Sequence, residues 1–546
     1  MMCLVESRAR MGILVALLLL ISLAAAPPIA PLASIARAQE EPAPNEAQAA
    51  PAPSLADSLK SVLNLPRYKH AHWGLLVVDL ETGKTLYRRN PDKLFAPASV
   101  TKLYTVAAGL DALGADFRFE TPIYARGTRG DDGTLDGDLV LVASGDFTMG
   151  GRTDPGGRIA YTDSDHIYAS FSGDSTLTRP DPLAGIDDLA QQVAESGVRR
   201  VSGQVIVDER LFESAEGTGS GPSRLTPIMI NDNLLDFVVT PTTAGQPAEF
   251  QWRPQTALFT VESQVATVPK DGALSLWIRA HGDGRIELRG TIPEGTPPKL
   301  ATYEVPDPAR FARTLLIEAL ARAGVTVDAS PTAENPADAL PPREEYEKLD
   351  CVAKLESPPF SESVKLILKV SHNLHASTLP LLIASKNGKR TLNDGMQLCR
   401  ELYVKAGVDP EGISFGGGAG GARADYVTPR ETVRLLKYMA TRDDFAAYKA
   451  GLPILGIDGT LATVIPADSP ARGHAFAKTG TLVWYDAVNA RLLLTSKALA
   501  GYVTTASGRE LAFAVFVNGV HLSDDVTAKT IGSDLGRVAE ILYGVP

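Results

Sequence analysis

The sequence pattern of helices and strands changes twice along the chain, and these two changes limit its possible folds more than any other feature. Residues 55–115 show a strand–turn–strand pattern followed by a helical pattern, and a similar alternation of helices and strands returns in 357–546. The intervening residues 116–356 are richer in strands and end with a Pro-rich stretch at 331–342 that is typical of a linker. We therefore predict one α/β (α+β) domain, built from 55–115 and 357–546, with further domains inserted between its two parts.

The inserted region is expected to be divided in turn. An outer part is predicted at about 116–170 and 290–345, around an inner strand-rich part at about 175–288. Within the inner part, Gly-Asp-Gly at 282–284 lies between two strand-like runs, which is a strong hairpin signal. Asp-Pro at 307–308 suits the N-cap and first position of a helix, so a helix is expected to begin there.

The N-terminal residues have the features of an export signal and a spacer. Two arginines precede an apolar run at 11–26, and Ala-Arg-Ala at 36–38 has the pattern of a cleavage site. We predict a signal peptide at 1–38 and a disordered Ala/Pro-rich linker at 39–54. An uncleaved membrane anchor is the alternative, but the apolar run is short for a membrane span. The protein is therefore expected to be exported and to work outside the cytoplasm, in the periplasm or cell envelope.

The charge balance excludes one class of partner. The chain carries 64 acidic and 53 basic side chains, giving a net charge of −11, whereas binding to nucleic acid needs a basic face. Two cysteines, Cys351 and Cys399, follow the predicted signal peptide. A disulfide between them is compatible with export, and so are two unpaired buried thiols.

Three short polar motifs occur in a fixed order. They are Ser99-Val-Thr-Lys102, Ser371-His-Asn373 and Lys478-Thr-Gly-Thr481. Each motif alone has an ordinary explanation: Ser99 can be a helix N-cap, Lys102 a solvated side chain, and the third motif a turn. All three in this order, with Ser99 at the start of a helix, are hard to explain by chance.

The spacing of the first motif suits nucleophilic catalysis. Ser99 and Lys102 lie one helical turn apart, so the lysine can accept the serine proton where burial lowers its pKa. A serine at a helix start also directs a backbone N–H group toward a reacting carbonyl.

The other two motifs supply groups that can bind a substrate or move a proton. We expect Ser371 to relay a proton to the departing amine and Asn373 to hold a substrate amide. We expect Lys478 to attract a substrate carboxylate. The substrate-binding residues are then expected to be Thr479, Gly480 and Thr481, through their hydroxyls and a strand edge.

Together with their neighbours, these motifs resemble a known family. Pro97-Ala-Ser-Val-Thr-Lys102 is similar to the nucleophile region of the class C low-molecular-mass penicillin-binding proteins, the D-Ala-D-Ala carboxypeptidase/endopeptidase family. Further segments that look like this family are 452–461, 477–482, 501–505 and 513–518. The resemblance covers roughly residues 55–546. It includes the 268 residues between Lys102 and Ser371, where the family has two nested domains.

The resemblance implies a fold, a reaction and a set of partners. The fold is a β-lactamase/transpeptidase-like serine acyltransferase domain with nested inserted domains. The reaction is hydrolysis of peptidoglycan stem peptides and cross-links through an acyl-enzyme on Ser99. The partners are those stem peptides and the β-lactam antibiotics that acylate the same serine. No cofactor and no metal is expected.

The chain departs from the family pattern in two places. A stretch that reads D-G-S-G-L-S-R in the family is Gly-Gly-Ala-Gly-Gly-Ala-Arg at 417–423, so an acid and two hydroxyls are replaced. The connection at 483–500 is longer than the corresponding connection in the family, which predicts an enlarged loop beside the active site. The Gly-rich run at 416–421 lacks the strand–loop–helix context of a dinucleotide site, and we expect a flexible loop there.

Two alternative functions share the motifs. A β-lactamase would use the same residues, but the long insert favours the peptidase. A non-catalytic peptidoglycan-binding protein of the same fold is disfavoured, because the nucleophile, base and anion-binding residues are all present. We also expect residues 116–356 to contribute no proton-transfer group and to shape access to the groove, with a purely structural or partner-binding module as the alternative.

Two histidines have the spacing of a metal site. His372 and His375 are three residues apart, but no Cys, Asp or Glu lies close in sequence to complete a ligand set. We expect His372 to line the groove and His375 to be packed or exposed.

Overall fold

The computed structural model describes residues 54–171 and 173–546, and its central feature is an antiparallel sheet made from both ends of this range. The strand order is β19-β20-β21-β1-β2, and the short β22 pairs with β20. The strands are β1 (His72–Asp79), β2 (Thr85–Arg89), β19 (Ala475–Asp486), β20 (Arg491–Thr504), β21 (Glu510–Asn518) and β22 (Val520–His521). Strand β1 pairs with β21 along its whole length, so the N-terminal hairpin joins the C-terminal strands directly. The predicted signal peptide and almost all of the predicted linker lie outside the described residues.

The central strands are apolar on both faces because helices cover both. In β1, Leu76 and Val78 enter one core, whereas Trp73, Leu75 and Val77 enter the other. Successive strand residues point to opposite faces, so this alternation follows from the strand itself. Such near-continuous apolar strands are typical of a sheet buried on both faces.

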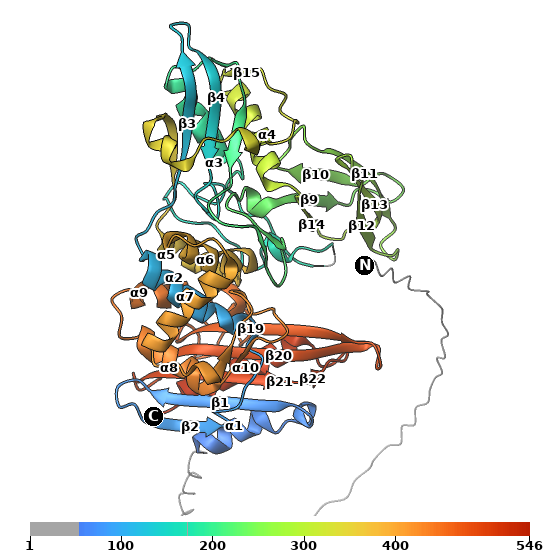
Figure 1. The fold of residues 1–546 in the computed structure, drawn as a ribbon. Coiled ribbons are helices and arrows are strands. Elements are labelled where there is room, and N and C mark those ends of the chain that lie inside the picture. Colours follow the sequence, from blue (N-terminus) through green and yellow to red (C-terminus); the bar gives the residue numbers. More distant parts are fainter. Residues whose placement is uncertain (1–53, 172) are drawn as a thin grey trace, which may run out of the picture. The chain divides into compact units, whose positions relative to one another are not determined.

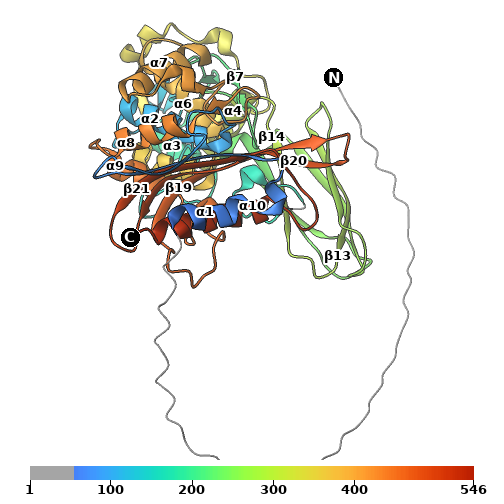
Figure 2. The ribbon, with the colours of Figure 1, turned by 90° about the horizontal axis from the view of Figure 1, so that it is seen from below.

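Helices α1 (Leu55–Leu63) and α10 (Ala528–Tyr543) lie together on one face of the sheet, as Figure 2 shows. The remaining helices of this domain lie on the other face (Figure 1). They are α2 (Thr101–Leu113), α5 (Phe360–Lys365), α6 (Asn373–Lys386), α7 (Leu392–Lys405), α8 (Pro429–Met439) and α9 (Phe445–Gly451). Helix α2 is buried all round from Thr101 to Leu110, which makes Lys102 an unusual charged residue in an apolar layer.

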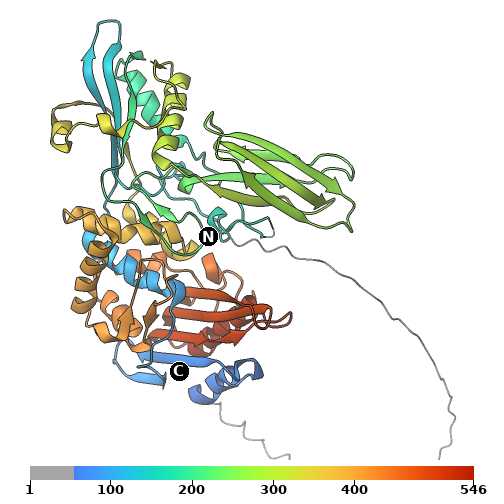
Figure 3. The same cartoon turned by 45° about the vertical axis from the view of Figure 1, so that its right-hand side comes forward.

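The described residues between Glu120 and Glu356 form three larger sheets, a two-stranded sheet of β7 (Ala215–Glu216) and β8 (Arg224–Leu225), and two α-helices (Figure 3). One sheet contains β3 (Glu120–Arg129), β4 (Thr134–Val142), β5 (Arg200–Val201), β6 (Val205–Asp208), β15 (Thr326–Val327) and β16 (Asp350–Glu356). Two three-stranded sheets contain β9 (Leu234–Thr240), β10 (Glu249–Arg253) and β14 (Lys299–Glu304), and β11 (Thr260–Val268), β12 (Ser275–Ala280) and β13 (Arg285–Pro293). Helices α3 (Ala184–Glu195) and α4 (Pro308–Arg322) share one core with all three sheets.

Several local predictions can be compared with this structure. The predicted hairpin is present as the antiparallel pair β12–β13. Helix α4 begins as expected, since the Asp307 side chain accepts a hydrogen bond from the backbone N–H of Arg310. The two three-stranded sheets extend from Leu234 to Glu304, further along the chain than the predicted inner part at about 175–288. Cys351 is exposed and Cys399 is buried, and neither is in a disulfide. Within the described part of the chain, no helix is both long and apolar enough to cross a membrane.

Candidate active site

The first motif forms a tight turn into the buried helix α2. A short helical turn, η2 (Ala98–Val100), leads directly into α2, and Ala98 has a positive φ of 47°. Ser99 is half-buried, whereas Lys102 is fully buried one turn further on. The Lys102 ammonium nitrogen lies 2.9 Å from the Ser99 hydroxyl. The predicted nucleophile and base are therefore within direct proton-transfer distance.

The surroundings of Lys102 favour its neutral form. Burial lowers the pKa of Lys102 to about 7, and the more distant charge of Asp425 opposes this shift. Its nitrogen also lies 2.7 Å from Asn373 Oδ1 and 2.9 Å from the Ala419 carbonyl oxygen. A neutral amine can donate to both of these oxygens and still offer its lone pair to the Ser99 hydroxyl.

The second motif meets the first across the helical layer. A single π-helical turn, η7 (Leu366–Val370), ends at Ser371, which has a left-handed backbone (φ 68°, ψ 39°). Asn373 is the first residue of α6, and its side-chain oxygen accepts a hydrogen bond from Lys102. Left-handed backbone is unfavourable for a non-glycine residue, so the surrounding contacts must hold Ser371 in place.

The third motif lies on the edge strand β19. Gly480 packs against the residue before η2, since a Cβ there would lie 2.5 Å from the Pro97 carbonyl oxygen. The Thr479 hydroxyl donates to that of Thr460 at 2.7 Å, and the Thr481 hydroxyl accepts from Lys497 at 2.7 Å. A glycine at 480 is thus required for β19 to approach Ser99.

Lys478 lies beneath this strand edge and is fully buried. Its ammonium donates to the Thr479 carbonyl oxygen at 2.9 Å. Burial, with repulsion from Lys102 and Lys497, lowers the pKa of Lys478 well below its ordinary value. An anionic ligand bound here would stabilise the protonated forms of Lys102, Lys478 and Lys497.

One cavity joins these elements. It has a volume of about 310 Å³ and is lined by Ser99, Tyr168, Gly219, Ser220, Ser371, Asn373, Ala419, Gly420, Gly421, Thr460, Thr479, Thr481, Leu482 and Val483. Five of the eight predicted site residues thus line one space. The other three, Lys102, Lys478 and Gly480, lie directly behind its wall.

Residues of the inserted region also reach the site, which the sequence motifs did not indicate. The Tyr168 hydroxyl donates to the Ser371 carbonyl oxygen at 2.6 Å, and the Asn373 side-chain amide donates to the Ser220 carbonyl oxygen at 3.1 Å. A Cβ at Gly219 would lie 2.5 Å from the Asn373 side chain. The insert therefore closes one side of the cavity and contacts the second motif.

The Gly-rich run packs closely instead of forming the expected flexible loop. Residues 417–420 are buried, and a Cβ at Gly418 would lie 2.0 Å from the Ala376 carbonyl oxygen. A Cβ at Gly420 would lie 2.0 Å from the Ala98 carbonyl oxygen. The glycines thus allow this loop to fit between η2 and α6, where the Ala419 carbonyl oxygen contacts Lys102.

The longer connection after the third motif is not the enlarged loop that we expected. Strands β19 and β20 continue their pairing to Asp486 and Arg491, so the extra residues extend a hairpin. The arm exposes Val483, Trp484 and Tyr485, and Val483 also lines the cavity. Arg423 lies over the Trp484 ring at 5.6 Å from its centroid.

The prediction that His372 lines the groove is wrong. His372 and His375 are both fully buried, with their rings stacked at 3.6 Å. The acid that seemed to be missing is Asp232, from the inserted region, whose Oδ1 lies 2.7 Å from His375 Nε2 and 3.4 Å from His372 Nε2. Sequence proximity could not reveal it, because 139 residues lie between Asp232 and His372.

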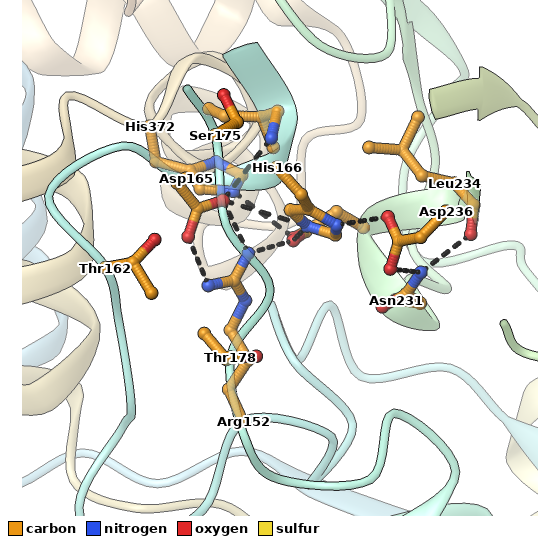
Figure 4. A network of polar contacts seen from close by, with 12 residues as sticks. Arg152, Thr162, Asp165, His166, Ser175, Thr178, Asn231, Leu234, Asp236 and His372 are labelled. Atoms are coloured by element: carbon orange, nitrogen blue, oxygen red, sulfur yellow. Dashed lines mark hydrogen bonds and ion pairs between the residues drawn. The ribbon is translucent and has the colours of Figure 1, made fainter. Parts of the chain in front are cut away.

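Asp232 belongs to a larger network of buried ion pairs, most of which Figure 4 shows. The Arg152 guanidinium donates to both oxygens of Asp165, at 2.7 and 2.9 Å, and to Asp232 at 2.6 Å. His166 lies between Asp232 and Asp236, with one ring nitrogen 2.8 Å and the other 2.6 Å from a carboxylate. Burial alone would lower the pKa of His166, but these two carboxylates raise it to about 10.

The residues of this network fit a set of ion pairs better than a metal-binding site. Asp232, His372 and His375 offer ligand atoms within 4.8 Å of one another. However, Arg152 already occupies one Asp232 oxygen, and the stacked imidazoles have nearly parallel planes, at 21°. The three carboxylates of the network are balanced by Arg152, Arg253 and the His166 imidazolium. A divalent cation would add charge where none is needed.

The fold and the cavity define a class of protein. An antiparallel sheet covered by helices on both faces, with a serine and a lysine at the start of a buried helix beside the edge strand, is the arrangement of the β-lactamase/transpeptidase-like serine acyltransferases. The chain belongs to the D-Ala-D-Ala carboxypeptidase 3 (S13) family, which matches residues 55–154 and 155–540. The resemblance and the fold class predicted from the sequence are thus confirmed.

Individual relatives agree with this assignment. The chain is 30% identical over 501 residues to the D-alanyl-D-alanine carboxypeptidase of Actinomadura sp. (strain R39), covering 88% of this chain and 83% of the relative. It is 25% identical over 488 residues to the D-alanyl-D-alanine carboxypeptidase DacB of Haemophilus influenzae, covering 86% and 90%. The crystal structure of penicillin binding protein 4 (dacB) from H. influenzae has the same fold. Its TM-score is 0.65 at 22% identity, covering 90% of this chain and 98% of that one.

Proposed function

We propose that this protein is a serine-type D-Ala-D-Ala carboxypeptidase that cleaves peptidoglycan stem peptides through an acyl-enzyme on Ser99. The observation that carries the proposal is the 2.9 Å contact between Ser99 and the buried Lys102 at the cavity that Ser371, Asn373 and β19 share. Family membership and two curated relatives named as D-alanyl-D-alanine carboxypeptidases support it. Release of D-Ala from an N-acylated peptide ending in D-Ala-D-Ala tests it.

Acylation follows from the arrangement of the first two motifs. Neutral Lys102 accepts the proton of the Ser99 hydroxyl, and the serine oxygen attacks the carbonyl carbon of the penultimate D-Ala. The peptide C–N bond then breaks, and its nitrogen receives a proton from Lys102, relayed by Ser371, so that D-Ala leaves as the free amino acid. Water later attacks the carbonyl carbon of the Ser99 ester and gives up a proton to Lys102. The ester C–O bond then breaks, the Ser99 oxygen takes that proton back from Lys102, and the shortened peptide is released.

The edge of β19 is proposed to orient the substrate. An extended peptide can pair with a free strand edge through backbone hydrogen bonds. The Thr479 and Thr481 hydroxyls lie along that edge, next to the carboxylate-binding charge that we assign to Lys478. Asn373 accepts a hydrogen bond from Lys102 with its side-chain oxygen, donates one amide N–H to the Ser220 carbonyl oxygen, and has the other N–H for the substrate.

The pH dependence of acylation follows from the lowered pKa of Lys102. Below a pH of about 7, Lys102 is protonated and cannot accept the serine proton. We expect the second-order rate constant for β-lactam acylation to rise about tenfold per pH unit up to pH 7 and to level off above it. Stopped-flow or gel-based labelling between pH 5.5 and 8.5 measures this, with circular dichroism as a check on folding. A rate that is constant from pH 5.5 to 7 would contradict the role of Lys102.

An endopeptidase activity on D-Ala cross-links is a second candidate, favoured by the exposed β19–β20 arm. The arm continues from the cavity wall at Val483 and presents an aromatic surface that could contact the second strand of a cross-link. We expect Trp484→Ala to lower kcat/KM about tenfold for a cross-linked muropeptide and less than twofold for a short D-Ala-D-Ala peptide. Trp277→Ala is the matched control, because Trp277 is similarly exposed and also lies beside an arginine, Arg289. Equal effects of Trp484→Ala on both substrates would refute this contact.

The proposal extends to the ligands of the protein, its location and its domain organisation. A solved H. influenzae relative is a complex with a β-lactam, which supports β-lactams as acylating ligands of this chain. The apolar N-terminal run and a peptidoglycan substrate together support an exported, extracytoplasmic protein. The shared core of the sheets between Glu120 and Glu356 supports residues 116–356 as an inserted region within a catalytic domain at 55–115 and 357–546.

A further inference from the structure

The inserted region shares a buried apolar core with the catalytic domain. Phe147, Phe212, Leu225 and Met229 are buried in the same apolar core as α2 and α6. The ion-pair network lies beside this core and reaches His372 and His375 in the first turn of α6. Since Ser371 directly precedes that turn, any group that fixes His372 and His375 also fixes the second motif.

The insert contacts the second motif and the helical turn that follows it at three separate points. Tyr168 binds the Ser371 carbonyl, Ser220 binds the Asn373 side chain, and Asp232 binds His375. Tyr168 and His166 lie on the same short helix, η3 (His166–Tyr168), so the network that holds His166 also sets the position of Tyr168.

Asp232 is itself held in an unusual conformation. It is the middle residue of η4 (Asn231–Asn233), where three successive residues have positive φ angles of 50°, 53° and 55°. Non-glycine residues adopt this backbone only where surrounding contacts impose it. Here Asp232 points between Arg152 and His375 and is 2% exposed.

Stability alone is a poor explanation for such a cluster. Buried ion pairs often contribute little net stability, because each charge must first lose its hydration. Their fixed geometry, however, can hold neighbouring groups in one arrangement. The group that needs such support here is Ser371, whose left-handed backbone lines the cavity opposite β19.

We propose that Asp232 of the inserted region is a positioning residue for acylation, acting with Tyr168 to hold Ser371 and Asn373 in their reactive arrangement through His375 and the Ser371 carbonyl. This inference deepens the proposed function and rests on it. It also changes the role expected for the insert, which then supports the chemistry as well as limiting access.

Two variants test the proposal by separating the acylation rate from binding and folding. Asp232→Asn keeps the shape of the side chain and removes its charge, and Tyr168→Phe removes one hydroxyl. The acylation rate constant for a chromogenic β-lactam is expected to fall about 100-fold in the first and about tenfold in the second. The non-covalent Kd is expected to change less than threefold in both, because neither variant alters the Lys478 or Thr481 side chains.

The matched controls are Asp328→Asn and Tyr303→Phe, which make the same chemical changes elsewhere in the insert. Asp328 forms an exposed pair with Arg200, and Tyr303 lies on β14. Both controls are expected to acylate at the wild-type rate, with all melting temperatures measured in parallel. If Asp232→Asn does not fold, because it leaves one of the three buried positive charges of the network unbalanced, Tyr168→Phe alone decides.

The outcomes separate this inference from the proposed function. A wild-type protein that a β-lactam does not acylate would overturn the proposed function itself. With wild-type acylation established, a normal rate constant in folded Tyr168→Phe or Asp232→Asn would overturn the positioning role. A change confined to Kd would also overturn it, since that result would make Tyr168 a binding residue only.

Discussion

Ser99→Ala is expected to abolish covalent labelling by fluorescent penicillin and to lower D-Ala release by about 10³-fold or more. The reason is that, among the described residues, only Ser99 has a side-chain hydroxyl that both lines the cavity and contacts Lys102. Intact-protein mass spectrometry after incubation with a β-lactam measures the effect directly, as the presence or absence of one added acyl group.

Ser61→Ala is the control for this experiment. Ser61 lies on α1, is exposed, and bonds only to the Ser58 carbonyl oxygen within its own helix. This variant should be labelled like the wild type. Equal labelling of Ser99→Ala and Ser61→Ala would show that another residue is acylated.

Lys102→Arg and Lys478→Arg are expected to affect different kinetic constants. An arginine cannot give up its proton at neutral pH, so Lys102→Arg removes the base and should lower kcat about 10³-fold. Lys478→Arg keeps a positive charge beside the Thr479 and Thr481 edge. It should mainly raise KM, by about tenfold, with a smaller loss of kcat.

Steady-state kinetics on a short D-Ala-D-Ala peptide distinguishes the two roles. Both lysines are fully buried, so the thermal stability of each variant must be compared before the rates are interpreted. The matched chemical change makes each variant the control for the other. A larger loss of kcat in Lys478→Arg than in Lys102→Arg would refute this division.

The parts of the site that the sequence predicted are those set by local spacing. A serine and a lysine three residues apart on one helix must lie close together, and the 2.9 Å contact between Ser99 and Lys102 follows from that spacing. The Lys478–Thr481 segment was recognised as the third of three motifs in a fixed order, and the structure adds that Gly480 lets β19 pass close to the Pro97 carbonyl oxygen. The fold class followed from the resemblance carried by these motifs.

The parts that sequence reasoning missed depend on contacts between distant segments. Tyr168 and Asp232 reach the second motif from more than 100 residues away, and nothing in their local pattern distinguishes them from ordinary surface or turn residues. His372 was expected to face the groove because only its neighbours in sequence were considered, whereas its buried partner belongs to the insert.

The same limit applies to backbone conformation. The run at 416–421 suggested flexibility because glycine is permissive, but the glycines serve close packing against Ala98 and Ala376. The extra residues after Leu482 suggested a loop, but their apolar and β-branched side chains continue two paired strands.

A titration of the acylated enzyme shows whether Ser99 catalyses D-Ala release. Free D-Ala released from a stem pentapeptide is measured after the enzyme has been acylated to increasing fractions by a β-lactam, with the acylated fraction read by mass spectrometry. We expect one D-Ala per pentapeptide cleaved and a rate that falls in proportion to the acylated fraction, reaching zero at one acyl group per chain. Rapid hydrolysis of the β-lactam with no D-Ala release would identify a β-lactamase instead, and unchanged D-Ala release from fully acylated protein would show that Ser99 is not the catalytic residue.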